Sequence, residues 1–226
     1  MLRRTFVTAA SLSAVGLATP DAAGAQAAAQ GKPAGDGDVA RHAQDAWYDS
    51  LPRKHRLFID ATSADEAGNA LGFAFNFLRT SQTGYNLKDA DAGVVICLRH
   101  DATDFAFSND LWATNEYFQK LRYKHPETGK KVKGGNIYRL GSTKPASLPD
   151  GFTYDGLAKR GVHFAICGVA TRGIASEIAG KNATREAIED VMDKLIAGLP
   201  ANAHLMASGI LAAQRAGEYG YTVVRA

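Results

Sequence analysis

Cys97 and Cys167 are the residues of this sequence best suited to covalent chemistry. Cys167 precedes a segment of helical composition and stands five residues before Arg172, and the positive end of a helix and a nearby arginine both favour a thiolate. A thiolate there can attack an electrophile or carry sulfur. The alternative is that Cys167 packs in the core as a small apolar side chain, as cysteines often do. The apolar neighbours of Cys97 favour this structural role for Cys97.

A polar turn follows the apolar run 93–98. It begins with Arg99, His100 and Asp101, and Thr103 follows closely. His100 can donate a proton, bind a metal ion or haem, or serve only as a polar surface residue. The expected site comprises Cys167 as the reacting residue and His100, Thr103, Arg172 and Arg99 as ligand-binding residues.

Motifs that would hold a common cofactor are absent from the sequence. No G-x-G-x-x-G follows the first expected strand, and no G-x-x-x-x-G-K-[ST] phosphate loop occurs. The six histidines include no H-x-x-x-H pair, and the G-x-S-x-G motif of serine hydrolases is missing. We therefore expect no cofactor and no structural metal site.

Apolar runs alternate with segments of helical spacing along the chain. Runs of strand length occupy residues 57–61, 93–98, 162–167, 203–208 and 221–225. Helical patterns lie between them at 62–84, 109–123, 154–159, 170–179, 184–197 and 209–216. This alternation predicts a three-layer α/β sandwich with a mainly parallel five-stranded sheet, as in flavodoxin-like folds. The carboxyl ends of parallel strands meet at one edge, where ligands usually bind.

A disulfide between the two cysteines is the other use that an oxidising compartment allows. If the first strand lies between the two strands that carry Cys97 and Cys167, their backbones are about 9.6 Å apart. That separation exceeds the limit of about 7 Å for a bridged pair. We therefore expect both cysteines to be free.

The N-terminus is typical of an export leader. Arg3 and Arg4 precede a mild apolar stretch at residues 7–18, which is too short to span a bilayer, and Ala23-Gly24-Ala25 has the small-x-small pattern of a cleavage site. We expect residues 1–25 to be a signal peptide of the twin-arginine type, with a general secretory leader as the alternative, and a periplasmic or otherwise exported protein.

The rest of the chain is predicted to form a linker and one domain. Residues 26–50 lack a hydrophobic period and predict a flexible linker, and residues 51–226 predict the α/β domain. Within it, a loop insert at 124–149 is rich in Gly, Pro and Lys, and predicts either a functional flap or a peripheral hairpin around residues 136–138. The formal net charge of +3 provides no basic field for nucleic acid, and no later apolar run is long enough to insert into a membrane.

Several stretches resemble the DsrE/DsrF-like family, and in particular its exported, poorly characterised branch. The similar stretches are residues 55–62, 94–106, 164–168, 172–173, 209–217 and 219–224. The resemblance implies a five-stranded parallel sheet, a homo-oligomer that is a trimer or hexamer, and a sulfur-carrying cysteine to which Cys167 corresponds. The insert at 124–149 departs from the compact family pattern.

Together these observations lead to two expectations for function. The first is an exported protein that carries sulfur or binds a small ligand at Cys167, with a small molecule or a sulfur-transfer protein as its partner. The second is a non-enzymatic oligomeric binding or assembly module in which both cysteines belong to the core. Binding of a metal ion or haem through His100 is a further alternative.

Overall fold

The computed structural model describes residues 42–52, 54–121, 123–124, 129, 135–139 and 151–226. The expected signal peptide at 1–25, the linker as far as residue 41 and most of the insert at 124–149 lie outside the described residues. Five strands form one sheet in which every neighbouring pair is parallel, in the order β4-β3-β2-β1-β5. The strands are β1 (Arg56–Ala61), β2 (Gly93–Leu98), β3 (His163–Cys167), β4 (Ala203–Met206) and β5 (Thr222–Arg225). The predicted α/β fold with a five-stranded parallel sheet is confirmed.

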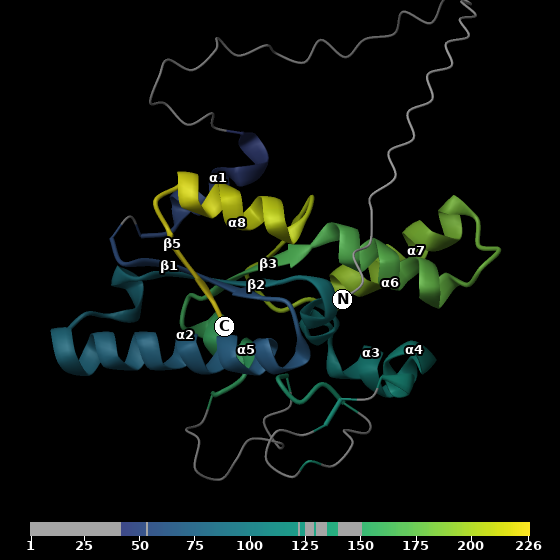
Figure 1. Cartoon of the computed structure of the whole chain (residues 1–226), viewed down its shortest axis with the longest axis horizontal. Helices are drawn as coiled ribbons and strands as arrows, with labels where there is room; N and C mark the ends of the chain where they lie inside the picture. Colours follow the sequence, from purple (N-terminus) through teal and green to yellow (C-terminus); the bar gives the residue numbers. More distant parts are fainter. Residues whose placement is uncertain (1–41, 53, 122, 125–128, 130–134, 140–150) are drawn as a thin grey trace, which may run out of the picture. The chain divides into compact units, whose positions relative to one another are not determined.

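Helices cover both faces of the sheet. They are α1 (Ala46–Ser50), α2 (Ala64–Tyr85), α3 (Asn109–Thr114), α4 (Glu116–Lys120), α5 (Tyr154–Lys159), α6 (Gly168–Ala179), α7 (Arg185–Ala197) and α8 (Gly209–Glu218). Strands β2, β3 and β4 are added one after another in the same direction from β1. The last connection runs back across the sheet and places β5 on the other side of β1. Because such crossovers are right-handed, this reversal places α8 on the opposite face from α2. Figure 1 shows α1 and α8 on one side of the sheet and α2 and α5 on the other.

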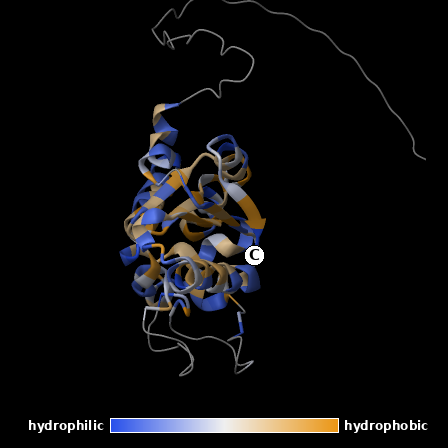
Figure 2. Ribbon diagram, turned by 90° about the vertical axis from the view of Figure 1, so that its left-hand side faces the viewer, coloured by the Kyte–Doolittle hydropathy of each residue, from blue (hydrophilic) through white to orange (hydrophobic). Residues whose placement is uncertain are grey.

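Each face of the sheet has its own hydrophobic core. Ile59, Ile96 and Phe164 point toward α2 and α5, whereas Phe58 and Val95 point toward α1 and α8. All six residues of β2 are buried, which explains why this strand is a continuous apolar run. Figure 2 shows the hydrophobic strands inside and more hydrophilic residues on the surrounding helices.

Helix α2 follows the predicted pattern closely. The side chain of Ser63 accepts a hydrogen bond from the backbone N–H of Glu66 at 3.3 Å and so caps the first turn. The apolar stripe faces the sheet through Ala67, Ala70, Leu71, Ala74, Phe75 and Leu78, which are all buried. Among the described residues, no helix has the length and apolar character needed to cross a membrane.

The long helix expected at 109–123 is a wrong prediction, because Asn115 divides this segment into α3 and α4. Asn115 has an extended backbone, with φ −97° and ψ 127°, and its side chain accepts a hydrogen bond from the N–H of Tyr117 at 2.9 Å. Its side chain thus caps a new helix instead of continuing the old one.

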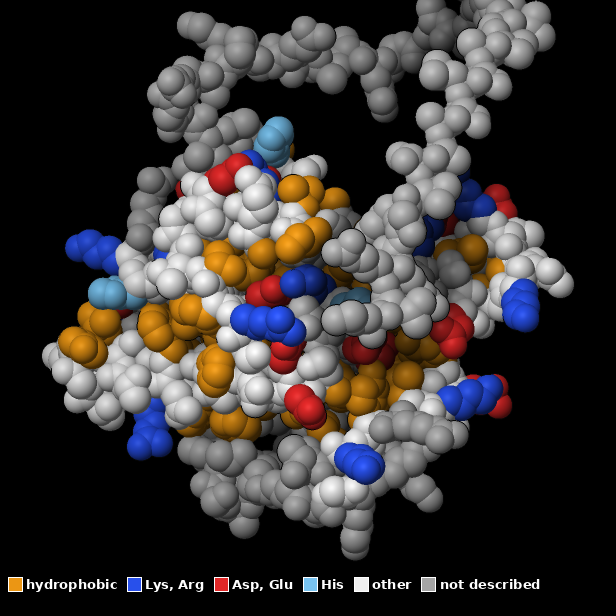
Figure 3. All heavy atoms as spheres, in the orientation of Figure 1, with side chains coloured by type: hydrophobic (Ala, Val, Ile, Leu, Met, Phe, Trp, Pro, Cys, Tyr) orange, Lys and Arg blue, Asp and Glu red, His pale blue; other side chains and the backbone are white. Residues whose placement is uncertain are grey.

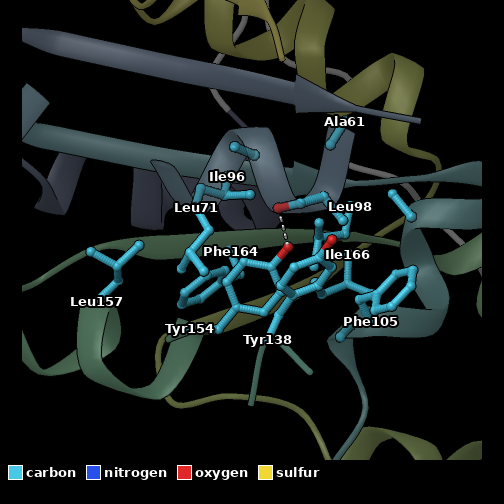
Figure 4. Packing of buried hydrophobic residues seen from close by; sticks show 14 of the residues in the cluster. Ala61, Leu71, Ile96, Leu98, Phe105, Tyr138, Tyr154, Leu157, Phe164 and Ile166 are labelled. Atoms are coloured by element: carbon cyan, nitrogen blue, oxygen red, sulfur yellow. Dashed lines mark hydrogen bonds between the residues drawn. The ribbon is translucent and has the colours of Figure 1, made fainter. Parts of the chain in front are cut away.

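The part of the insert that the structure describes is not a peripheral hairpin. Asn136 is fully buried, and its Nδ2 donates to the carbonyl oxygens of Phe105 at 2.7 Å and Phe107 at 2.8 Å. The hydroxyl of Tyr138 donates to the carbonyl oxygen of Ala64 in α2 at 3.1 Å. Figure 4 shows Tyr138 among the core residues beside Tyr154. Residues 135–139 therefore anchor the insert to the domain.

The expected linker 26–50 ends in structured residues. Residues Ala43–Asp45 form a 3-10 helix, η1, and α1 follows directly. Tyr48 in α1 is fully buried, and its hydroxyl donates to the carbonyl oxygen of Ala212 in α8 at 3.0 Å. Arg215 of α8 donates to Asp45 at 2.8 Å in an ion pair that is almost completely buried. Residues 43–50 thus form part of the layer that covers the α8 face.

Candidate functional site

Cys167 ends strand β3 and immediately precedes helix α6. In the register of the sheet it is paired with Met206 at the end of β4. Side chains alternate along a strand, so Cys167 lies on the same face as Ala165, which belongs to the core under α8. Its side chain is largely buried, with 7% of its surface exposed. Cys167 therefore lies at the carboxyl edge of the sheet, as predicted, with a small opening to solvent.

Arg99 continues the line of β2 beyond the strand and is held by Asp60 of β1. Its Nε and Nη2 atoms donate to the two carboxylate oxygens of Asp60, each at 2.8 Å. These hydrogen bonds raise the pKa of Arg99 further above its ordinary value. Leu98 of β2 pairs with Ile166 of β3, so the same register continued by one residue brings Arg99 opposite Cys167. The predicted residue Arg99 thus shares the edge with Cys167.

The start of helix α8 leaves room for Arg99 only because residue 209 is glycine. A Cβ atom on Gly209 would lie 2.4 Å from Cβ and 2.8 Å from Cδ of Arg99. We expect Gly209→Ala to lower the free energy of unfolding by about 1–3 kcal/mol, the usual cost of overpacking, in urea denaturation. Gly217 in the same helix has no atom within 4 Å of such a Cβ, so Gly217→Ala should raise stability by about 0.5 kcal/mol. Equal effects of the two changes would contradict this packing argument.

Cys97 has a structural position. It is fully buried, and its Sγ donates to the carbonyl oxygen of Gly209 at 3.7 Å. Burial raises the pKa of the Cys97 thiol well above its usual value, and the negative charge of Asp60 adds to this shift. The expectation that Cys97 packs within the sheet is confirmed, and at neutral pH it is a thiol rather than a thiolate.

The two cysteines lie on neighbouring strands, with no strand between them. This corrects the strand order assumed above, because β2 pairs directly with β3 and Cys97 is opposite Ala165. Cys167 is two residues further along, so its backbone is about 8 Å from that of Cys97, from ~4.8 Å between strands and ~3.3 Å per residue. Both cysteines are free. The diagonal offset now explains why the pair is unbridged.

His100 and Thr103 do not contribute to this site in the way expected. The side chain of His100 is 73% exposed, and its Nδ1 lies 2.9 Å from a carboxylate oxygen of its neighbour Asp101. Thr103 is fully buried, and its hydroxyl donates to the carbonyl oxygen of Leu98 at 3.2 Å. The Thr103 hydroxyl therefore stabilises the turn after β2 and is not available to a ligand. Within the described residues, no group of three or more His, Cys, Asp or Glu side chains is arranged for a metal ion.

Arg172 also points elsewhere. It lies on α6, but its Nη2 donates to both carboxylate oxygens of Glu189 on α7, at 3.0 and 3.3 Å. Five residues after Cys167 amount to about one and a half turns of helix, which places Arg172 on another side of α6. The prediction that Arg172 lines the site with Cys167 is therefore replaced by an exposed ion pair between two helices.

One buried carboxylate was not predicted from the sequence. Asp104 in the 3-10 helix η3 (His100–Ala106) is 4% exposed, and its two oxygens accept hydrogen bonds from Tyr117 at 3.0 Å and Tyr123 at 2.7 Å. Burial raises the pKa of Asp104 to about 6. Its only signal in the sequence is an acidic residue within an otherwise apolar turn. Asp60 gave a similar signal, because it is a carboxylate inside the apolar run 57–61.

Charged and apolar side chains adjoin one another on the surface near these residues. Arg225, at the end of β5, donates to Glu66 at 2.7 Å, and hydrogen bonds from Thr62 are the main reason why the pKa of Glu66 is lowered to about 2. Figure 3 shows acidic and basic side chains next to each other around the place where β5 ends in Figure 1, with hydrophobic side chains around them.

A groove of about 360 Å³ lies between η1, α8 and the end of β4, and Met206 and Ser208 contribute to its lining.

The geometry thus brings Arg99 next to Cys167 and Asp60, and the buried Cys97 lies opposite Asp60 in the register of β1 and β2, whereas Thr103 and Arg172 are engaged elsewhere. The resemblance to the DsrE/DsrF-like family remains a prediction that rests on the residues quoted for it. No protein-family model, curated protein or solved structure matches this chain.

Proposed function

We propose that the protein carries a sulfur atom as a persulfide on Cys167. The observation that carries this proposal is the position of Arg99, which Asp60 holds through two hydrogen bonds and which the register of β2 and β3 brings opposite Cys167. Cys97 is fully buried, so Cys167 is the cysteine with access to solvent. A fixed guanidinium beside the accessible thiol stabilises negative charge on sulfur before and after the transfer.

The transfer needs no additional oxidant or reductant. The thiolate of Cys167 attacks the terminal sulfur of a donor persulfide, R–S–SH, and forms a new S–S bond. The S–S bond of the donor breaks, and its electron pair leaves with the thiolate R–S⁻. The product is Cys167–S–SH, whose proton dissociates to give a terminal sulfur anion beside Arg99. A sulfur-transfer partner protein would receive this sulfur by the same reaction in the opposite sense.

Mass spectrometry of the intact protein tests the proposal. After incubation with glutathione persulfide, the wild type should gain the mass of one sulfur atom, and a reducing thiol should remove it. The variant Cys97→Ser should gain the same mass, and Cys167→Ser should gain none. An adduct that persists in Cys167→Ser, or a wild type that gains no sulfur while it is folded, would rule out Cys167 as the carrier.

A second function has its own support in exposed apolar residues at the starts of α6 and α8. Val169 in the first turn of α6 is 66% exposed, and Ile210 in the first turn of α8 is 64% exposed. Such side chains suit an interface, so a homo-oligomeric binding or assembly module is the alternative proposal. Light scattering after size-exclusion chromatography should then show a trimer or hexamer, and Cys167→Ser should keep both the assembly and the cellular phenotype.

The proposed location is outside the cytoplasm, after removal of residues 1–25. The paired Arg3 and Arg4 and the small residues 23–25 support it. Cell fractionation and N-terminal sequencing of the mature protein should place its start near Gln26. Replacement of both Arg3 and Arg4 by Lys should stop export if the twin-arginine route is used, and leave it unchanged if the general route is used.

A further inference from the structure

Two histidines that are 41 residues apart in the sequence face each other on the α8 side of the sheet. Nδ1 of His163 in β3 lies 2.9 Å from Nε2 of His204 in β4. The ring planes differ by 9°, and the ring centroids are 5.2 Å apart. With their nitrogens so close and their centroids so far apart, the two rings lie edge to edge in almost one plane. Each imidazole therefore directs one nitrogen at the other.

Trp47 of α1 covers this pair. Its ring is stacked on His204, with centroids 3.9 Å apart and planes 6° apart, and lies parallel to His163 at 6.0 Å. The indole N–H of Trp47 is buried and has no hydrogen-bond partner among the described residues. The histidine pair is thus covered on one side by an aromatic face, whose negative potential attracts cations.

In their neutral forms the two imidazoles share one hydrogen across this gap. At 2.9 Å one of the facing nitrogens donates it and the other accepts it, and the tautomer decides which one donates. The outer nitrogens, Nε2 of His163 and Nδ1 of His204, have no hydrogen-bond partner among the described side chains and backbone. If both hydrogens occupy the outer nitrogens, the two inner lone pairs point into the same gap.

We propose that His163 and His204 form a two-coordinate site for a soft monovalent cation, Cu(I) or Ag(I). The cation takes the place of the shared hydrogen, which moves to the free outer nitrogen, so no proton needs to be released. Bonds of about 2 Å to each nitrogen would place the two atoms about 4 Å apart in line. That requires the rings to separate by roughly 1 Å, which small side-chain rotations on the edge strand β4 can provide.

The donor set favours this cation over zinc. Imidazole nitrogens bind copper well, and a structural Zn²⁺ site uses four ligands. The described part of the chain offers no third His, Cys, Asp or Glu around the pair. This site is separate from the proposed chemistry of Cys167, and neither proposal depends on the other.

Titration with Ag(I) tests the site, because silver does not change its oxidation state. Thiols bind silver strongly, so the protein used is the full chain with Cys97→Ala and Cys167→Ala, shown to be folded by circular dichroism. One equivalent of Ag(I) should shift the imidazole ¹⁵N resonances of His163 and His204 and quench the fluorescence of Trp47. A further Trp112→Phe change isolates the Trp47 signal.

Matched histidine variants complete the test. His204→Gln should lower the affinity for Ag(I) by at least about 100-fold. Loss of a residue that only hydrogen-bonds to a metal ligand already costs up to about 100-fold in affinity, and His204 would be a ligand itself. His100→Gln, which changes an exposed histidine, should leave the affinity unchanged. Resonance shifts confined to other histidines, an absence of saturable binding at one equivalent, or displacement of Ag(I) by equimolar Zn²⁺ would each overturn the proposal.

Discussion

Replacement of Arg99 by methionine is expected to lower the free energy of unfolding by about 3 kcal/mol, because it leaves the mostly buried carboxylate of Asp60 without its cation. The same variant should load sulfur onto Cys167 at least about tenfold more slowly, which corresponds to a loss of roughly 1.4 kcal/mol of charge stabilisation. Methionine keeps most of the apolar stem that packs against Gly209. The decreases in stability and in loading rate therefore measure the effect of removing the charge and not the effect of a cavity.

A double variant and a matched control separate these effects. Asp60→Asn combined with Arg99→Met removes both charges, and should recover most of the lost stability without restoring the loading rate. Arg172→Met removes an arginine from an exposed ion pair and should change stability by less than about 0.5 kcal/mol and loading not at all. Urea denaturation followed by circular dichroism measures stability, and timed mass spectrometry measures loading. If Arg172→Met slowed loading as much as Arg99→Met, the assignment of Arg99 would be wrong.

The second large effect concerns the pH dependence that Asp104 imposes on stability. The pKa of Asp104 in the folded protein is about 6, above the ordinary value of 3.8, so the folded state binds this proton more tightly than the unfolded state. The contribution of Asp104 to stability is therefore fully present below pH 4 and is lost as the pH rises through 6. Two pKa units correspond to about 3 kcal/mol.

The difference in unfolding free energy between the wild type and Asp104→Asn isolates this contribution from other titrating groups. It should change by about 3 kcal/mol between pH 4 and pH 7, in the direction that makes the wild type relatively less stable at pH 7. Asp110→Asn is the control, because it removes a carboxylate at an exposed position of α3 instead of a buried one. A constant difference for Asp104→Asn would mean that Tyr117 and Tyr123 offset the cost of burying the charge.

Most of the secondary structure was predictable because it follows from local patterns. The apolar run 93–98 became the fully buried strand β2, and the spacing of apolar residues after Ser63 became α2. The break at Asn115 was missed, since hydrophobic spacing continues on both sides of it and only the capping side chain marks the boundary. The packing of residues 135–139 was missed for a similar reason, because a polar turn in a loop does not reveal that Asn136 will donate hydrogen bonds to the carbonyl groups of Phe105 and Phe107 at the end of η3.

The candidate site was predictable in its location but only partly in its residues. Parallel strands place Cys167 and Arg99 at one edge, and the sequence was sufficient for that inference. Thr103 and Arg172 are engaged elsewhere: the hydroxyl of Thr103 donates to the carbonyl oxygen of Leu98 in its own turn, and Arg172 donates to Glu189 on α7, a partner that the sequence does not reveal. Asp60 was missed, since its importance arises only when the side chain of Arg99 lies beside it.

By itself, the sequence determined the alternation of strands and helices, the parallel sheet and the edge that carries Cys167, because these follow from the period of apolar residues along the chain. The tertiary structure decided the strand order and the register between strands. The register pairs His204 with Ala165, and this brings His204 diagonally next to His163 on the same face of the sheet. No local sequence pattern indicates which residues of two neighbouring strands will be paired. Contacts between distant residues depend on the packing of the whole sheet, so only the folded chain shows them.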